Sequence, residues 1–158
     1  MMLKPLMTTL AVTTALTAPG IAAARQVTFS TTLNNYGGPP AFLAYYVTDA
    51  NGAYVGTLWM AGARARYYEH LDGWYRASGG DMSQLNGITG ASVGSGQTLT
   101  ITLDLVDSVF DAGYVLHIDA AAENMRSVPN DVKVPLTAAG AGQGVKGKGY
   151  IARFTYSM

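Results

Sequence analysis

The sequence predicts a mainly β fold: a two-sheet antiparallel sandwich of the immunoglobulin-like type with one short helix. Three observations lead to this class. Apolar and polar residues alternate in several short segments, an Asn-Gly pair separates two β-rich segments, and turn-forming residues recur along the chain, with 19 glycines and 6 prolines among 158 residues. The chain length and the lack of an internal repeat or linker predict a single domain.

The first 24 residues are predicted to be a secretory signal peptide and not part of the fold. Lys4 supplies a positive start, an apolar stretch covers 6–16, and three alanines at 22–24 precede the expected cleavage after Ala24. An uncleaved membrane anchor is the alternative, but threonines interrupt the apolar run, which is shorter than the roughly 20 residues of a membrane-spanning helix. We therefore expect a periplasmic protein whose single domain covers residues 25–158.

Period-two alternation predicts six or seven strands. The clearest is 98–105, where leucines and Ile101 alternate with threonines and Asp104. Similar patterns occur at 27–33, 114–120, 132–134 and 150–156, and β-rich runs occur at 45–47 and 54–59. Asn51-Gly52 lies between two β-rich runs and predicts a hairpin.

Two segments depart from the strand pattern. Tyr67, Leu71 and Trp74 recur at helical spacing within 63–75, which predicts one short helix or helical turn across one end of the sheets. The Ala/Gly/Lys-rich stretch 137–149 predicts a long loop between the last two strands, the most loosely structured part of the domain.

The composition excludes several classes of function. The chain has no cysteine, 10 basic residues and 10 acidic residues, so it is not a disulfide scaffold, a thiolate zinc module or a basic nucleic-acid binder. A chain without thiols is also compatible with an oxidising periplasm.

Two glycine-rich motifs match known patterns by their letters but not by their context. Residues 142–147 fit a dinucleotide-binding fingerprint, and residues 90–94 fit the nucleophile elbow of hydrolases. Both motifs require a strand before them and a helix after them, whereas a predicted strand follows each one here.

The histidines and aspartates give no sign of a metal site. His70 and His117 lack a second ligand at a suitable spacing, so a structural or surface role is expected for each. Asp104, Asp107 and Asp111 lack the loop pattern that wraps a calcium ion and are predicted to be solvated charges at strand ends. We expect no catalytic and no metal-binding residues.

One segment carries a functional signal. Asn86-Gly87-Ile88-Thr89-Gly90-Ala91-Ser92 resembles the acceptor motif of proteins that carry covalent flavin mononucleotide (FMN): an Asp, two free positions, Ser or Thr, Gly, Ala, then the modified Thr or Ser. Asn86 stands where Asp is usual, and Ser92 where Thr is commoner.

A wider resemblance covers roughly residues 42–123. The run from Tyr45 to Trp59, the tyrosine-rich segment up to Trp74, Gly113-Tyr114-Val115-Leu116 and Glu123 resemble a bacterial periplasmic family catalogued as a predicted periplasmic domain of unknown function. That family has β-sandwich character, and its members often occur with PepSY-type membrane reductases and flavin transferases. Members of this family usually have a Trp-Asp-Gly segment before the strand that corresponds to Gly113-Tyr114-Val115-Leu116. This chain lacks that segment and has residues 103–107 near the corresponding position.

These resemblances imply an exported redox carrier. A flavin transferase would esterify FMN through its phosphate to Ser92, and a PepSY-type membrane reductase would supply electrons. The acceptor loop would be shaped by five residues: Asn86, Gly87, Thr89, Gly90 and Ala91. Nearby tyrosines or Trp74 would cover the flavin ring. The alternative is a non-catalytic sandwich that binds a partner or scaffolds a reductase without a cofactor, and a free-standing enzyme is the least favoured.

Overall fold

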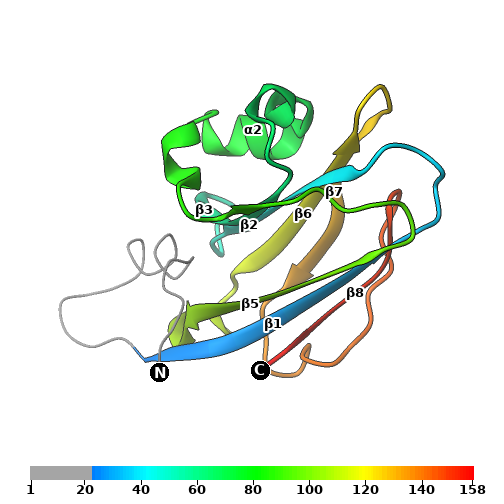
Figure 1. The fold of residues 1–158 in the computed structure, drawn as a ribbon. Helices are drawn as coiled ribbons and strands as arrows, with labels where there is room; N and C mark the ends of the chain where they lie inside the picture. The colour runs from blue at the N-terminus through cyan, green and yellow to red at the C-terminus, as the bar shows by residue number, and fades with distance from the viewer. Residues whose placement is uncertain (1–22) are drawn as a thin grey trace.

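A computed structural model describes residues 23–158 of the chain. Two β-sheets pack face to face, and a layer of short helices covers the outer face of the larger sheet (Figure 1). The predicted two-sheet sandwich is therefore confirmed. The predicted signal peptide lies outside the described residues, apart from Ala23 and Ala24.

The smaller sheet is antiparallel and has the order β5-β1-β8. Its strands are β1 (Ala24–Leu33), β5 (Thr98–Val106) and β8 (Ile151–Ser157). Alternate residues of β1 and β5 are buried, as the sequence pattern predicts. The central strand β1 therefore pairs on both sides with strands that come much later in the chain.

The larger sheet has the order β4-β3-β2-β6-β7. Its strands are β2 (Ala41–Thr48), β3 (Tyr54–Ala61), β4 (Thr89–Gly90), β6 (Val115–Ala122) and β7 (Ser127–Pro135). All neighbours pair antiparallel except β3 and β4, which pair in parallel. The two-residue strand β4 is too short to produce an alternating pattern, so the sequence did not predict it.

The predicted hairpin joins β2 to β3. Gly52 has a φ of +84°, a conformation that glycine adopts without strain. The Asp49 carboxylate accepts hydrogen bonds from the backbone N–H groups of Asn51 and Ala53, both at 2.9 Å. Turn chemistry and side-chain capping thus fix this connection together.

The main core lies between the two sheets and is rich in aromatic rings. Phe29 of β1 stacks on Tyr45 of β2 with ring centroids 6.0 Å apart, and it meets Phe154 of β8 edge to face at 5.6 Å. The buried Tyr45 hydroxyl is hydrogen-bonded to Thr31 at 2.8 Å, so this polar atom is satisfied within the core.

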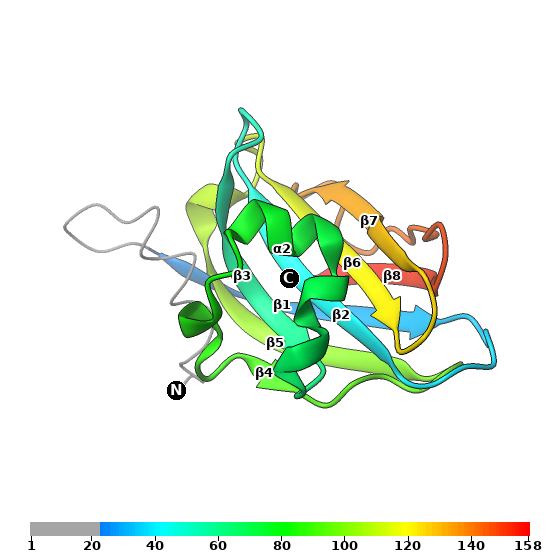
Figure 2. The same cartoon turned by 90° about the horizontal axis from the view of Figure 1, so that it is seen from above.

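The helical layer is the main departure from the sequence prediction. It contains η1 (Ala65–His70), α2 (Asp72–Ser78) and η2 (Met82–Leu85), and it lies over the larger sheet rather than across one end of both sheets (Figure 2). A second core forms there, in which Leu71 and Trp74 pack against residues of β2, β3 and β6. Strand β2 is buried at all eight positions because one of its faces meets each core.

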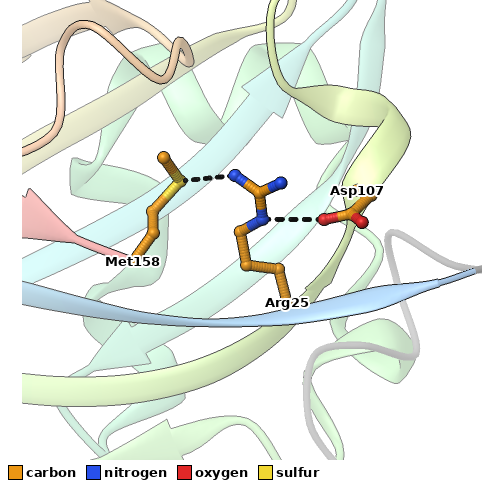
Figure 3. Close-up of polar contacts among 3 residues, drawn as sticks. All are labelled: Arg25, Asp107 and Met158. Atoms are coloured by element: carbon orange, nitrogen blue, oxygen red, sulfur yellow. Dashed lines mark hydrogen bonds and ion pairs between the residues drawn. The ribbon is translucent and has the colours of Figure 1, made fainter.

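One end of the smaller sheet is tied by Arg25. Its Nε donates to the Asp107 carboxylate at 2.7 Å, and its Nη1 contacts the sulfur of Met158 at 3.3 Å (Figure 3). Asp107 begins the short helix η3 (Asp107–Val109), which follows β5, and Met158 follows β8. Asp107, one of the predicted solvated charges, is therefore in an ion pair with Arg25, and the Arg25 side chain links the ends of the three strands.

The predicted long loop between β7 and β8 is confirmed, but it is held at several points. The buried Asp131 carboxylate accepts four backbone N–H groups, from residues 148–151, at 2.7 to 3.3 Å. Val145 pairs with Phe154 as an isolated bridge, and no helix follows 142–147. The dinucleotide fingerprint thus fails on context, as expected.

Candidate functional site

The acceptor-like segment 86–92 runs from the end of η2 along the edge of β3. Asn86 follows η2, and Gly87 has a φ of +82°, with no atom within 4 Å of the position that a Cβ would occupy. Ile88 is buried in the second core, and its carbonyl accepts the Met60 N–H at 2.9 Å. The side chain of Ile88 therefore anchors the segment while Asn86 and Gly87 stay exposed.

Gly90 is required by close packing. A Cβ on Gly90 would lie 2.7 Å from Cζ2 of Trp59, so a larger residue would displace the indole ring. The Gly90 carbonyl accepts the Gly62 N–H at 2.7 Å. Thr89, its neighbour in β4, is exposed.

Ser92 lies between two fixed points of the backbone. Gly90 is held by β3 on one side, and on the other Val93 exchanges two backbone hydrogen bonds with Ala41, at 2.7 and 2.9 Å. Ser92 is half-buried, and within residues 23–158 its hydroxyl makes no hydrogen bond. Its backbone position is therefore fixed while its hydroxyl is unengaged.

Ser92 forms part of the wall of a surface hollow of about 350 Å³. This Ser92 hollow is lined by Pro39, Pro40, Phe42, Ala63, Arg64, Tyr67, Ala91, Ser92 and Glu123. Its volume lies at the lower end of the range for small-molecule sites, roughly 300–1,000 Å³. The lining combines aromatic and proline rings with one cation and one carboxylate.

A second hollow of about 380 Å³ adjoins the first and shares Phe42, Tyr67 and Glu123 with it. Its remaining lining residues are His70, Ala121, Ala122, Asn124 and Met125. The Tyr67 hydroxyl donates to Glu123 at 2.8 Å, and the Tyr67 and Phe42 rings meet edge to face at 5.5 Å. Tyr67 is thus held in place where the two hollows meet.

The surroundings of Ser92 do not resemble a hydrolase centre. In the described part of the chain, no histidine or carboxylate is hydrogen-bonded to Ser92, and a turn and then β5 follow Val93. Activation of a serine nucleophile needs an adjacent base. The nucleophile-elbow pattern of 90–94 is therefore absent in structure, and an external base would be needed to activate this hydroxyl.

Most of the aromatic side chains considered as covers for a flavin ring are unavailable. Trp74 is 0% exposed, and its Nε1 donates to Thr57 at 2.8 Å. Tyr45, Tyr46 and Tyr68 are also buried. Tyr67 is the tyrosine that lines both hollows.

A buried polar cluster under α2 was not predicted. Asp119 of β6 is 1% exposed and accepts the backbone N–H groups of Trp74 at 2.6 Å and Asn130 at 2.7 Å. Burial raises the pKa of Asp119, an effect opposed by these two hydrogen bonds. A Cβ on Gly73 would lie 2.5 Å from the Asp119 carboxylate, which explains a glycine within α2.

His117 belongs to the same cluster and stacks on Tyr46 at 4.8 Å. Its Nε2 is hydrogen-bonded to Thr48 at 2.8 Å and its Nδ1 to Asn130 at 2.7 Å. Burial lowers the pKa of His117. All these groups have protein partners, so the cluster joins the helical layer to the sheet and does not form a ligand site.

The sequence pattern that could have indicated this cluster is His117-x-Asp119, which places two polar residues on one face of a strand.

No group of three metal-ligating His, Cys, Asp or Glu side chains occurs among residues 23–158. Over the same residues, no helix is both long enough and apolar enough to cross a membrane.

Among protein families, the one described as predicted periplasmic protein (DUF2271) matches residues 24–153. No curated protein and no solved structure matches the chain.

Proposed function

The chain belongs to the family described as predicted periplasmic protein (DUF2271), and we propose that it is a periplasmic electron carrier whose FMN is esterified through its phosphate to the Ser92 hydroxyl. The observation that carries this proposal is the setting of Ser92. The final residue of the acceptor-like segment has a fixed backbone, an unengaged hydroxyl and a place in the wall of a hollow.

The residues around Ser92 fit an attached flavin phosphate. Arg64 lines the same hollow, and a guanidinium matches the charge and geometry of phosphate oxygens. Tyr67, Phe42 and two prolines offer apolar surface for a planar ring. The FMN would supply reversible electron transfer, while these side chains would position it and limit its contact with water.

Attachment requires a second protein. The Ser92 oxygen attacks the flavin-side phosphorus of a flavin dinucleotide, the bond between the two phosphates breaks, and AMP leaves. The hydroxyl proton passes to a base of the flavin transferase, which also supplies magnesium. The electron donor that we propose is a PepSY-type membrane reductase.

Covalent labelling tests the proposal. The chain is co-expressed with an exported flavin transferase, and its intact mass and visible spectrum are measured. We expect yellow protein with the mass of one added FMN residue, mapped by proteolysis to the peptide that contains Ser92. Ser92→Ala should abolish the label and leave the circular dichroism spectrum unchanged, whereas Ser92→Thr should keep the label.

Ser95→Ala is the matched control, because Ser95 lies three residues away and its hydroxyl bonds to Asn35 and Gly37 instead. This variant should be labelled like the parent chain. An unmodified mass in the presence of an active transferase, or a label that survives Ser92→Ala, would contradict the proposal.

The second candidate is a periplasmic sandwich that binds a partner or scaffolds a reductase without a cofactor. The observation that favours it is the structural role of the glycines: Gly87 adopts a positive φ and Gly90 packs against Trp59. In that case the segment is a connection between η2 and β5. The same experiment separates the two candidates, because a scaffold keeps its unmodified mass.

A further inference from the structure

Each β-sheet has two edges, and three of the four edges in the described domain are protected. The segment 142–147 runs along β8 and exchanges backbone hydrogen bonds with it, including two between Val145 and Phe154 at 2.8 and 2.9 Å. Strand β4 pairs with the end of β3, and Gln84 of η2 is hydrogen-bonded to Tyr54 at its start. Strand β7 contains Pro129 and Pro135, and its Asp131 carbonyl accepts the Lys148 N–H. Such features keep sheet edges from pairing with other chains.

The fourth edge, that of β5, has none of these features. The strand is nine residues long, contains no proline, lysine or arginine, and pairs with β1 without a register shift. No described segment pairs with its outer side. A long and regular edge of this kind is a template for pairing with another strand.

The hydrogen-bond pattern shows which residues face outward. Leu33 N–H donates to the Gln97 carbonyl and Asp107 N–H to the Ala23 carbonyl, and both pairs continue the register between β1 and β5. Antiparallel strands alternate bonded and non-bonded pairs, so the odd-numbered residues of β5 bond to β1. The even-numbered residues, among them Thr98, Thr100 and Thr102, therefore direct their N–H and C=O groups to the outer edge.

We propose that β5 pairs antiparallel with β5 of a second copy of this chain, about a two-fold axis at Thr102, and joins the two smaller sheets into one. With Thr102 opposite its own symmetry mate, Thr100 faces Asp104 of the second copy. Every even-numbered residue then faces an even-numbered one, as the outward hydrogen bonds require.

The side chains also complement each other in this register. Ile101 faces Leu103 of the second copy and Leu99 faces Leu105, so the apolar side of the sheet continues across the axis. No carboxylate faces a carboxylate. Without Lys4 of the predicted signal peptide, the chain has 9 basic and 10 acidic residues, so little net repulsion opposes the approach of two copies. This self-complementarity favours a second copy over an unrelated extended peptide as the occupant.

Sedimentation of the processed protein between about 1 µM and about 1 mM tests this dimer. We expect a reversible dimer. Thr102→Pro removes an outward N–H but no backbone hydrogen bond to β1, and should weaken dimerisation by about tenfold or more. It also loses the hydrogen bond between the Thr102 and Thr28 hydroxyls, a loss that it shares with Thr102→Val. Thr102→Val keeps the N–H and serves as the control, with an unchanged dissociation constant. A protein that stays monomeric up to the highest concentration would overturn the proposal.

Single cysteines provide a test that does not depend on how the proline variant folds, because the chain has no cysteine of its own. Bonded antiparallel pairs have Cα atoms about 5.5 Å apart, within disulfide range. Thr102→Cys should form an intermolecular disulfide under mild oxidation, and Thr98→Cys and Thr100→Cys should not. Equal cross-linking at the three positions, or none at Thr102, would show that β5 does not pair in this way.

Discussion

Asp119 joins the helical layer to the larger sheet through two backbone N–H groups, one from α2 and one from β7. Each carboxylate oxygen faces its own donor. In Asp119→Asn an NH₂ group must face one of these N–H groups and leave it without an acceptor.

For Asp119→Asn we therefore expect a loss of about 2 kcal/mol in the free energy of unfolding, measured with a chemical denaturant. Asp72→Asn is the control, because Asp72 is exposed and bonds to the Ser127 hydroxyl. A change in the control variant as large as that in Asp119→Asn would argue against a special role for the buried carboxylate.

His117 makes the stability depend on pH. Its pKa is lowered from 6.5 in the folded protein because burial disfavours the charged ring. The unfolded chain thus binds the proton at a higher pH than the folded protein, so stability is complete above pH 6.5 and falls as the pH drops below it.

Denaturation curves at several pH values between about 7 and 5 measure this dependence. We expect His117→Gln to flatten it, although the variant starts from a lower stability. His70→Gln serves as the control and should retain the parent slope, because His70 is exposed. Equal slopes in the parent and His117→Gln would mean that another group titrates.

Single residues also show what the sequence could and could not reveal about the candidate site. The segment 86–92 was found from its letters, and the structure places Ser92 in the wall of a hollow. A nearby tyrosine was expected, and Tyr67 lines the hollow, but Arg64, Phe42 and Glu123 were not predicted to lie around Ser92, because they come from separate segments that only the folded chain brings together. Trp74 was expected near the flavin ring and is buried instead. Helical spacing indicates that a side chain is packed, but it does not identify the residues against which it packs.

At the scale of an element, the loop between β7 and β8 shows how one side chain can order a glycine-rich segment. Its composition indicates loose structure, yet Asp131 accepts four consecutive N–H groups where the loop meets β8. The residues next to Asp131 in the sequence do not indicate that its carboxylate accepts hydrogen bonds from a segment 17 or more positions away.

Asp131→Asn should therefore loosen the end of this loop. We expect the free energy of unfolding to fall by about 2–3 kcal/mol, since an amide can accept through only one of its two end atoms. Amide hydrogen exchange should accelerate at 148–151 before it does so in the rest of the domain.

Asp111→Asn tests whether any aspartate near this loop has the same effect. Asp111 is exposed, accepts a single N–H from Ala138, and has a φ of 59°, which asparagine also tolerates. Its exchange pattern should match that of the parent. Faster exchange at 148–151 in Asp111→Asn would assign the effect to the loop in general.

The helical layer marks the limit of pattern-based prediction for elements. The pattern around Tyr67, Leu71 and Trp74 correctly indicated helix, but the layer also includes η2 and covers a sheet face. The run Ala41–Thr48 was the available signal: it is apolar on both faces, which requires a covering layer on each side.

At the scale of the whole molecule, the class of fold follows from the sequence, but the order of the strands does not. Alternation in 27–33 and 98–105 shows that each strand has one buried face. It does not show that these two strands are neighbours, because pairing depends on contacts between distant residues. The division of the eight strands found in residues 23–158 into sheets of three and five therefore required the structure.

The central place of β1 in the smaller sheet has a consequence for a chain that emerges with its N-terminus first. The partners of β1 come late: Thr102 lies 74 positions after Thr28, and Met158 lies 133 positions after Arg25. The β2–β3 hairpin can form as soon as it leaves a ribosome or an export channel, whereas β1 must wait for β8, which contains the last strand residues. During that interval its apolar residues, among them Val27 and Phe29, are open to other chains. Among the strands of residues 23–158, the first to emerge is thus the last to be completed, and the risk of misassembly lasts until β8 has emerged.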